Sequence, residues 1–255
     1  MKIQQIRNAT IIVEYAGKKI LVDPMLSDKG ALPTTPIPAK TWSFKRNPLH
    51  DLPISKTEIV KDLDFVFLSH LHFDHWDKEA ENVLPKGIKI FVQDQADKLK
   101  IEKAGFTNVE ILSENSSFGE IKLSRTKAQH GKGFMLRLAG FVSGLVLKHS
   151  SEKTLYIAAD TVWYEGVQEA IDKHKPDVVV LNGGDNQFFF GGQLIMNKKD
   201  IYEVHKATPN AKIVVSHMEG VNHNTLTRKD LKEFLNETEI IDKVNVPEDG
   251  QSYIF

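Results

Sequence analysis

The stretch His70-Leu71-His72-Phe73-Asp74-His75 brings three imidazoles and one carboxylate into six consecutive residues. The run before it, Asp64–Ser69 (DFVFLS), is short and apolar, which is typical of a buried strand. The segment after it, Asp77–Leu84, has the pattern of a helix. We therefore expect the stretch to form a strand-to-helix turn, a place where α/β proteins often carry functional side chains.

The spacing within this turn favours metal binding. His70 and His72 are separated by one residue, so in an extended chain their side chains point the same way. Asp74 and His75 follow where the chain turns toward the helix. Two pairs of ligands can thus face two neighbouring metal positions, where imidazole suits zinc and a carboxylate offsets the charge of the cations. The alternative is a polar turn whose histidines bond to the backbone.

Three further candidate ligands follow strand-like runs elsewhere in the chain. His130 comes after the segment that includes Lys122–Ala128, Asp160 directly follows TLYIAA, and His217 directly follows KIVVS. Side chains at one end of a sheet converge on a common crevice. The sequence therefore predicts that these residues join the cluster at His70.

The composition narrows the class of protein. Hydrophobic content of 41% and charged content of 26% are ordinary for a globular chain. A net charge of −1 without a basic stripe disfavours a nucleic-acid partner. The apolar runs are too short to span a bilayer, and the N-terminus lacks the pattern of a signal peptide. With no cysteine, the metals must be held by nitrogen and oxygen, and we expect a cytoplasmic protein with no membrane partner.

No internal repeat or low-complexity linker interrupts the chain, so we interpret residues 1–255 as one domain. The first half is strand-rich and the second alternates strand with helix, which favours α/β (α+β) architecture with two sheets between helices, a four-layer αββα sandwich. The predicted strands are Ala9–Ala16, Lys18–Asp23, Asp64–Ser69, Lys89–Gln93, Val109–Leu112, Thr154–Ala159, Asp177–Asn182 and Lys212–Ser216, with a mostly extended segment over 118–149 and a final strand at Lys243–Val246 or Ser252–Phe255. The predicted helices are Asp77–Leu84, Asp94–Ala104, Val162–His174, Lys198–Ala207 and Thr227–Asn236.

Residues 25–56 form a proline-rich segment without a sustained period, which predicts a long loop that serves as an active-site lid or binding loop. Arg46 lies in it, beside the aromatic residues Trp42 and Phe44, and could pair with an anionic substrate group or anchor the loop. His223 follows His217 closely and could line the pocket or bond to the backbone. Arg46 and His223 are the candidate substrate-binding residues.

The segment SHLHFDHWD, residues 69–77, resembles the His-X-His-X-Asp-His signature of the metallo-β-lactamase superfamily. Asp23 resembles the early structural aspartate of that family, and the later candidate ligands occur in the family's order. The stretch Asn182-Gly183-Gly184, followed by Leu194-Ile195-Met196, is most similar to the branch of ascorbate-6-phosphate lactonase and related metal-dependent hydrolases. The resemblance implies the metallo-β-lactamase fold, with the site at the edge between two sheets.

The same resemblance implies two divalent metal ions, with zinc favoured and manganese or iron as alternatives. It assigns the ligands as follows: His70, His72 and His130 to the first metal; Asp74, His75 and His217 to the second; and Asp160 to both. A hydroxide between the metals would attack a small ester, lactone or phosphoester, and Asp74 would also act in catalysis by accepting a proton.

Two other functions stay open. One is a nuclease or phosphodiesterase like RNase Z, which the absence of a basic surface in the sequence disfavours. The other is a non-catalytic metal-binding sensor, which the complete set of ligands disfavours. We expect a small-molecule substrate, and the run Phe188-Phe189-Phe190 leaves a homo-oligomer open.

Overall fold

The computed structural model describes residues 1–36, 45–189 and 192–255. The two strands expected around Gly17 are β2 (Thr10–Tyr15) and β3 (Lys18–Val22), which pair antiparallel. Ala16 and Gly17 connect them with positive φ angles of 49° and 73°. Two residues with positive φ match the right-handed twist of a hairpin, so this turn starts the first sheet.

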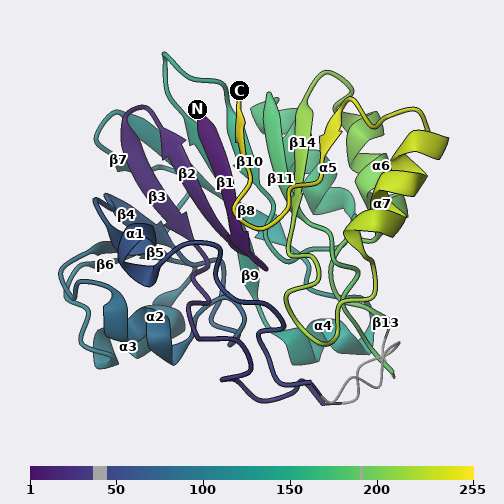
Figure 1. Ribbon diagram of the computed structural model, residues 1–255. Coiled ribbons are helices and arrows are strands. Elements are labelled where there is room, and N and C mark those ends of the chain that lie inside the picture. The colour runs from purple at the N-terminus through teal and green to yellow at the C-terminus, as the bar shows by residue number, and fades with distance from the viewer. Residues whose placement is uncertain (37–44, 190–191) are drawn as a thin grey trace.

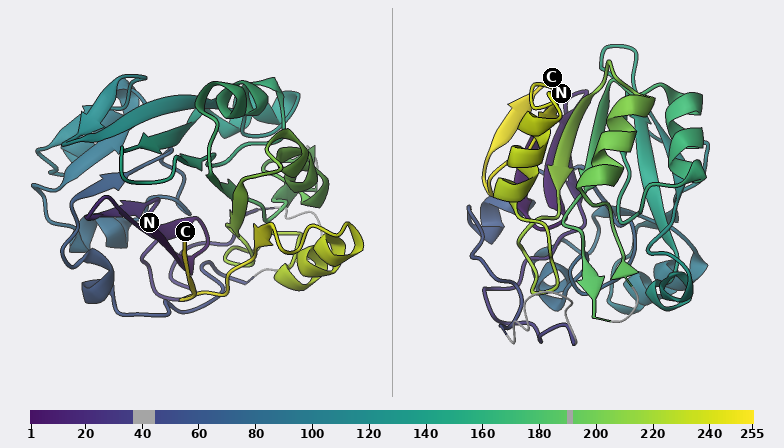
Figure 2. Two further views of the ribbon diagram at one scale, coloured as in Figure 1. Left: turned by 90° about the horizontal axis from the view of Figure 1, so that it is seen from above. Right: turned by 90° about the vertical axis from the view of Figure 1, so that its right-hand side faces the viewer.

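The first sheet has seven strands in the order β16-β1-β2-β3-β4-β5-β6. From β3 onward its neighbouring strands run parallel. Besides β2 and β3, its strands are β1 (Lys2–Arg7), β4 (Phe65–Phe67), β5 (Lys89–Val92), β6 (Val109–Ile111) and β16 (Ser252–Ile254). Because β1 pairs with β16, the two ends of the chain lie side by side (Figures 1 and 2).

The second sheet also has seven strands, in the order β15-β14-β11-β10-β9-β8-β7. Its strands are β7 (Ser116–Phe118), β8 (Ile121–Ala128), β9 (Val142–Lys148), β10 (Leu155–Ile157), β11 (Val178–Asn182), β14 (Lys212–Ser216) and β15 (Val244–Asn245). A short hairpin of β12 (Gln187–Phe188) and β13 (Gly192–Gln193) stands apart from both sheets.

Helices cover the outer face of each sheet, which confirms the αββα sandwich (Figures 1 and 2). On the first sheet lie α1 (Lys56–Val60), α2 (Lys78–Val83) and α3 (Gln95–Lys103); on the second lie α5 (Glu165–His174), α6 (Lys198–Ala207) and α7 (Arg228–Glu237). None of the helices in the described part of the chain is long and apolar enough to cross a membrane.

Three apolar cores hold these layers together. The central core joins the inner faces of the two sheets and includes Phe65, Phe91, Leu145 and Val180, whose exposed fractions are at most 1%. The two outer cores lie between each sheet and its own helices. Each fully buried side chain of this size contributes about 1.5–3 kcal/mol, so the sandwich is stabilised mainly by burial between layers.

The structure differs from the sequence prediction at five points, one of which is the β12–β13 hairpin, which the sequence does not predict. The sequence does not predict strand β1, because the adjacent polar residues Gln4 and Gln5 interrupt the alternation of apolar and polar side chains that marks a strand. Helix α1, with Ser55 as its N-cap, lies at the end of the predicted loop. The segment predicted as extended contains helix α4 (Phe134–Ala139). Both alternatives for the last strand form, one in each sheet, as β15 and β16.

Candidate metal centre

The candidate ligands lie where strands end at one edge of the sandwich. His70 follows β4 across Leu68 and Ser69, and Asp23 follows the parallel strand β3. In the second sheet His130, Asp160 and His217 come just after β8, β10 and β14. Strands β10, β11 and β14 are mutually parallel. Strand β8 runs in the same direction, because β8 and β10 are both antiparallel to β9, which lies between them. Their carboxyl ends therefore meet at the same edge, as the sequence predicts.

The first group of ligands consists of His70, His72 and His130. One ligand atom from each lies within 4.8 Å of the others. The Nε2 atom of His70 is 2.9 Å from Nδ1 of His72. His130 turns its Nδ1 toward the main-chain oxygen of Leu194 at 3.0 Å, which leaves its Nε2 facing the cluster. All three rings can direct a nitrogen lone pair at one point.

The second group consists of Asp74, His75 and His217, again with ligand atoms within 4.8 Å of one another. Nε2 of His217 is 3.3 Å from Oδ2 of Asp74 and 3.2 Å from Nε2 of His75. Asp160 lies between the two groups: its Oδ2 is 3.2 Å from Nε2 of His75 and 3.5 Å from Nε2 of His130. The structure therefore brings together all seven residues predicted as ligands.

Asp23 orients the segment that carries His70 and His75. Its carboxylate accepts hydrogen bonds from the amide and hydroxyl of Ser69, at 2.8 and 2.7 Å, and contacts Nδ1 of His75 at 2.9 Å. The Ser69 hydroxyl is also 3.0 Å from Nδ1 of His70. Carboxylates in this position fix the ring orientation and raise the basicity of metal-binding histidines.

Two asparagines that the sequence did not single out for this purpose complete the support. The side-chain amide of Asn182 donates to Oδ1 of Asp160 at 2.7 Å. The amide of Asn8 donates to the main-chain oxygen of Asp74 at 3.1 Å and is 3.4 Å from Nε2 of His217. Asn182 ends strand β11, so the rule that found the ligands at strand ends could have found it. Asn8 lies in a tight turn, and no comparable signal marks it.

Three carboxylates determine the charge state of His75. Burial lowers the pKa of His75, but Asp160, Asp23 and Asp74 outweigh burial and hold this pKa well above the usual value. In the protein without metal, His75 is therefore an imidazolium amid three carboxylates. The donor set thus draws positive charge into a buried space, as a cation site does.

Four other ligand groups, His70, His72, Asp74 and Asp160, are in the protonation states that bind metal. Burial and the neighbouring imidazoles lower the pKa of His70 well below its usual value and that of His72 to about 4, so both rings are neutral. Burial alone would raise the pKa values of Asp74 and Asp160, but the nearby imidazoles, His75 first, hold both well below the usual range. Neutral imidazole and ionised carboxylate are the ligand forms of zinc, manganese and iron, so the residues fit divalent metal ions.

His223 lies beside the cluster, which is the first of the two positions that the sequence leaves open for it. It is 7% exposed, and Asp74, His217 and Asp160 are among the charges that act on its ring. Phe188 stacks on this ring with a centroid distance of 5.8 Å and an interplanar angle of 5°. Phe188 in turn packs on an apolar wall formed with Met135, Leu194 and Ile195.

Arg46 does not extend from its loop to the cluster in any described contact. Its guanidinium donates to the main-chain oxygens of Gly30 and Ala31, at 2.7 and 2.8 Å, and so holds two parts of the proline-rich segment together. The structure thus favours the anchoring alternative for Arg46 over a substrate contact. Trp42 and Phe44 lie outside the described residues.

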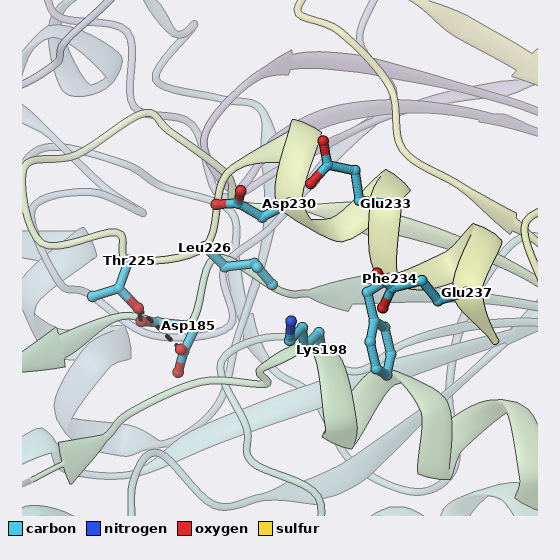
Figure 3. Close-up of a pocket in the computed structure, with 8 residues that line it drawn as sticks. All are labelled: Asp185, Lys198, Thr225, Leu226, Asp230, Glu233, Phe234 and Glu237. Carbon is cyan, nitrogen blue, oxygen red and sulfur yellow. Dashed lines mark hydrogen bonds between the residues drawn. The ribbon is translucent and has the colours of Figure 1, made fainter.

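A separate cavity of about 270 Å³ lies between helix α7, the start of α6 and the loops that carry Asp185 and Thr225 (Figure 3). Its lining residues do not include any of the seven candidate ligands, and its carboxylates come mainly from helix α7. The lining residues are Asp185, Lys198, Thr225, Leu226, Asp230, Glu233, Phe234 and Glu237. Thr225 and Asp185 are hydrogen-bonded across it, which fastens the loop before β12 to the loop after β14.

Comparisons with known proteins agree with this geometry. The profile of the family described as "Beta-lactamase superfamily domain" matches residues 18–218. UPF0173 protein YddR of Bacillus subtilis (strain 168) is 52% identical over 256 residues, covering 100% of both chains. The crystal structure of isothiocyanate hydrolase from Delia radicum gut bacteria superposes with a TM-score of 0.95 at 40% identity, covering 100% of this chain and 99% of that one. That of "a possible metal-dependent hydrolase" from Veillonella parvula DSM 2008 has a TM-score of 0.96 at 35% identity, with the same coverage.

Proposed function

Because this chain belongs to the metallo-β-lactamase superfamily, we propose that it is a metal-dependent hydrolase with two divalent ions, acting on a small uncharged electrophile. The observation that carries this proposal is the pair of ligand groups that share no member, His70/His72/His130 and Asp74/His75/His217. Asp160 joins them, since the group His70/His75/Asp160 overlaps both. Divalent ions held in this way supply a water that ionises near neutral pH and a positive charge that polarises the substrate.

The chain's own residues bind and orient. Imidazole supplies most of the donors, which favours zinc first, with manganese or iron as the alternatives. Asp23 and Asn182 hold His75 and Asp160 in place. Asp74 is ionised, as is Asp160; the family resemblance assigns to Asp74 the additional role of accepting a proton as water adds to the substrate.

An uncharged substrate is favoured by what surrounds the cluster. The main charges acting on His70, His72, Asp74, Asp160 and His223 come from the histidines and carboxylates of the cluster itself; among described residues, no lysine or arginine is one of them. In this described part of the chain, no side-chain cation therefore adds to the charge of the metals to favour an anionic phosphoester. The apolar wall beside His223 suits an apolar substituent instead.

An isothiocyanate meets this description, and the neighbour at 40% identity bears that activity in its name. In the reaction R–N=C=S + H₂O → R–NH₂ + COS, the water oxygen bonds to the central carbon and the C–N bond breaks. Both hydrogens of the water end on the amine nitrogen, so atoms and electrons balance. A lactone is the second uncharged electrophile to compare, because the sequence resembles the lactonase branch.

The test is a substrate panel with the zinc-, manganese- and iron-loaded protein. Benzyl isothiocyanate, a simple lactone, a chromogenic phosphodiester and a structured RNA are compared for turnover. We expect hydrolysis of the isothiocyanate, and a loss of at least about 100-fold in Asp160→Asn, since the ions contribute several kcal/mol of transition-state stabilisation. The matched control Asp172→Asn changes an exposed carboxylate that pairs with Lys175 and should leave the rate unchanged.

Faster turnover of the phosphodiester or the RNA than of the uncharged substrates would replace this proposal with the nuclease alternative. A protein that binds metal but hydrolyses none of the four would favour the non-catalytic sensor.

A further inference from the structure

We propose that His223 stabilises the reacting substrate through a hydrogen bond that its Nδ1–H donates to the heteroatom where negative charge develops. This inference deepens the proposed hydrolase function and rests on it. It assigns a specific atom, tautomer and role to a residue for which the sequence allows either a pocket position or a backbone contact.

The direction of the hydrogen bonds around His223 fixes its tautomer. The main-chain amide of Val221 donates to Oδ1 of Asn224 at 3.0 Å, which identifies the other atom of that side chain as the donor. This Nδ2 donates to Oδ1 of Asn186 and, at 3.2 Å, to the main-chain oxygen of His217. Asn186 is thereby oriented with its own Nδ2 toward Nε2 of His223, at 3.1 Å.

Since the Asn186 amide is a donor, Nε2 of His223 must accept. A neutral imidazole has one donor and one acceptor nitrogen, so the proton lies on Nδ1. Burial lowers the pKa of His223 to about 4, partly opposed by Asp74, so the ring is neutral at physiological pH. The chain of hydrogen bonds that begins at the Val221 amide thus leaves His223 only one tautomer.

This Nδ1–H is a buried donor without a partner among the described residues of the chain. A buried donor left unpaired costs about 1–3 kcal/mol, so native proteins retain such groups chiefly where a ligand or ordered water satisfies them. The ring belongs to the cluster's immediate surroundings, because Asp74, His217, Asp160 and His130 all act on its charge. Substrate bound at the cluster is therefore the partner that the location favours.

The fold holds this donor rigidly. Phe188 stacks on the ring, and the main-chain amide of Gln187 donates to the oxygen of His223 at 3.1 Å. Two residues further along the chain, the Thr225 hydroxyl donates to the main-chain oxygen and carboxylate of Asp185, at 2.6 and 3.0 Å (Figure 3). The two loops that carry Asn186 and His223 are thus fastened on both sides.

Gly184 lets these loops approach closely. A Cβ atom there would lie 2.2 Å from the oxygen of His217, 2.3 Å from Nδ2 of Asn224 and 2.9 Å from Oδ1 of Asn186. Only glycine fits, so the network that orients His223 depends on this position as well as on the asparagines.

The chemical consequence follows from the electron flow. When water adds to the carbon of an isothiocyanate or lactone, negative charge develops on nitrogen, sulfur or oxygen. A fixed donor at that atom stabilises the transition state more than the ground state, and losing one such donor typically lowers kcat by about 10²–10³-fold.

The test combines one spectroscopic and one kinetic measurement. In the metal-loaded wild-type protein, the ¹⁵N shifts of His223, assigned by the spectrum of a variant that lacks it, should show the Nδ1–H tautomer. For benzyl isothiocyanate or the lactone, whichever the wild type hydrolyses, His223→Phe should lower kcat by about 10²–10³-fold with little change in KM. His223→Asn, whose amide lies near the place of Nδ1, should recover most of this loss, whereas His223→Gln, whose amide lies near Nε2, should not.

The control is His149→Phe, since that ring contacts Ser151 and Glu120 on the surface. Metal content is measured in every variant, so a loss of ions is separated from a loss of the donor. An Nε2–H tautomer in the wild type, or a His223→Phe variant with wild-type kcat, overturns the role of His223. Failure of the wild type to hydrolyse any substrate sinks the proposed function instead, while the tautomer measurement still decides the state of His223.

Discussion

Replacing Asp23 with asparagine should weaken metal binding without disturbing the fold. Asp23 has a φ of 45°, a conformation that asparagine adopts readily. The asparagine oxygen keeps the bond from the Ser69 amide at 2.8 Å, and the Ser69 hydroxyl can reverse to accept. The contact with Nδ1 of His75 at 2.9 Å is lost, because a nitrogen donor then faces an N–H.

The expected magnitude follows from this single lost bond. A hydrogen bond to a charged group is worth about 1.5–3 kcal/mol. At about 1.4 kcal/mol per factor of ten, Asp23→Asn should weaken zinc binding by roughly 10- to 150-fold, in line with the usual effect of such supporting carboxylates. The assay is a zinc titration against a competing chelator at fixed pH.

The matched control is Asp77→Asn. Asp77 is also buried, but its carboxylate caps α2 by accepting from Ala80 at 2.8 Å and from Ser27 at 2.8 Å. We expect Asp77→Asn to lower the thermal midpoint and leave zinc affinity unchanged. Equal zinc affinity in wild type and Asp23→Asn would refute the assignment of Asp23 as the residue that orients His75.

Three further predictions concern stability. Gly184→Ala should lower the free energy of unfolding by at least about 1–3 kcal/mol, because its Cβ would lie 2.2 Å from a backbone oxygen. The control Gly87→Ala meets nothing within 4 Å and should be nearly neutral in the same urea titration. Asn47→Ala removes buried bonds of 2.9 and 2.8 Å to Asn222 and should cost about 1–3 kcal/mol in urea; a change near zero would count against this link between the proline-rich segment and the loop after β14. In chelator-treated protein, the stabilisation from protonated His75 is fully present below about pH 6.5 and is lost as pH rises through the raised pKa of this residue. The thermal midpoint should therefore fall toward alkaline pH, and a midpoint that stays flat or rises would contradict this prediction.

The strand ends explain why so much of the site is predictable. His130, Asp160 and His217 each follow a strand, and parallel strands bring such residues to one edge whatever the loops between them do. The αββα architecture follows from the same alternation of strand and helix. A prediction from strand ends needs only local patterns and one topological rule.

Other features depend on contacts that no local pattern records. Asn8 reaches Asp74 across 66 residues of sequence. Arg46 has the residue type expected of a substrate contact, but its place between Gly30 and Ala31 is set by the folding of an irregular loop. Helix α4 follows Gly133, whose φ of 56° is a turn that the glycine-rich sequence allows without specifying. The lid role of residues 25–56 and the single-domain interpretation stay predictions.

The most direct test of the central claim is the metal content of the purified protein, by elemental analysis, in wild type and in two single variants. With two ligand groups that share no member, we predict about two divalent ions per chain in the wild type. His72→Ala and His217→Ala each remove a ligand from one group only, and each should retain about one ion. A wild-type protein with one ion or none after incubation with zinc, manganese or iron would contradict the two-metal centre.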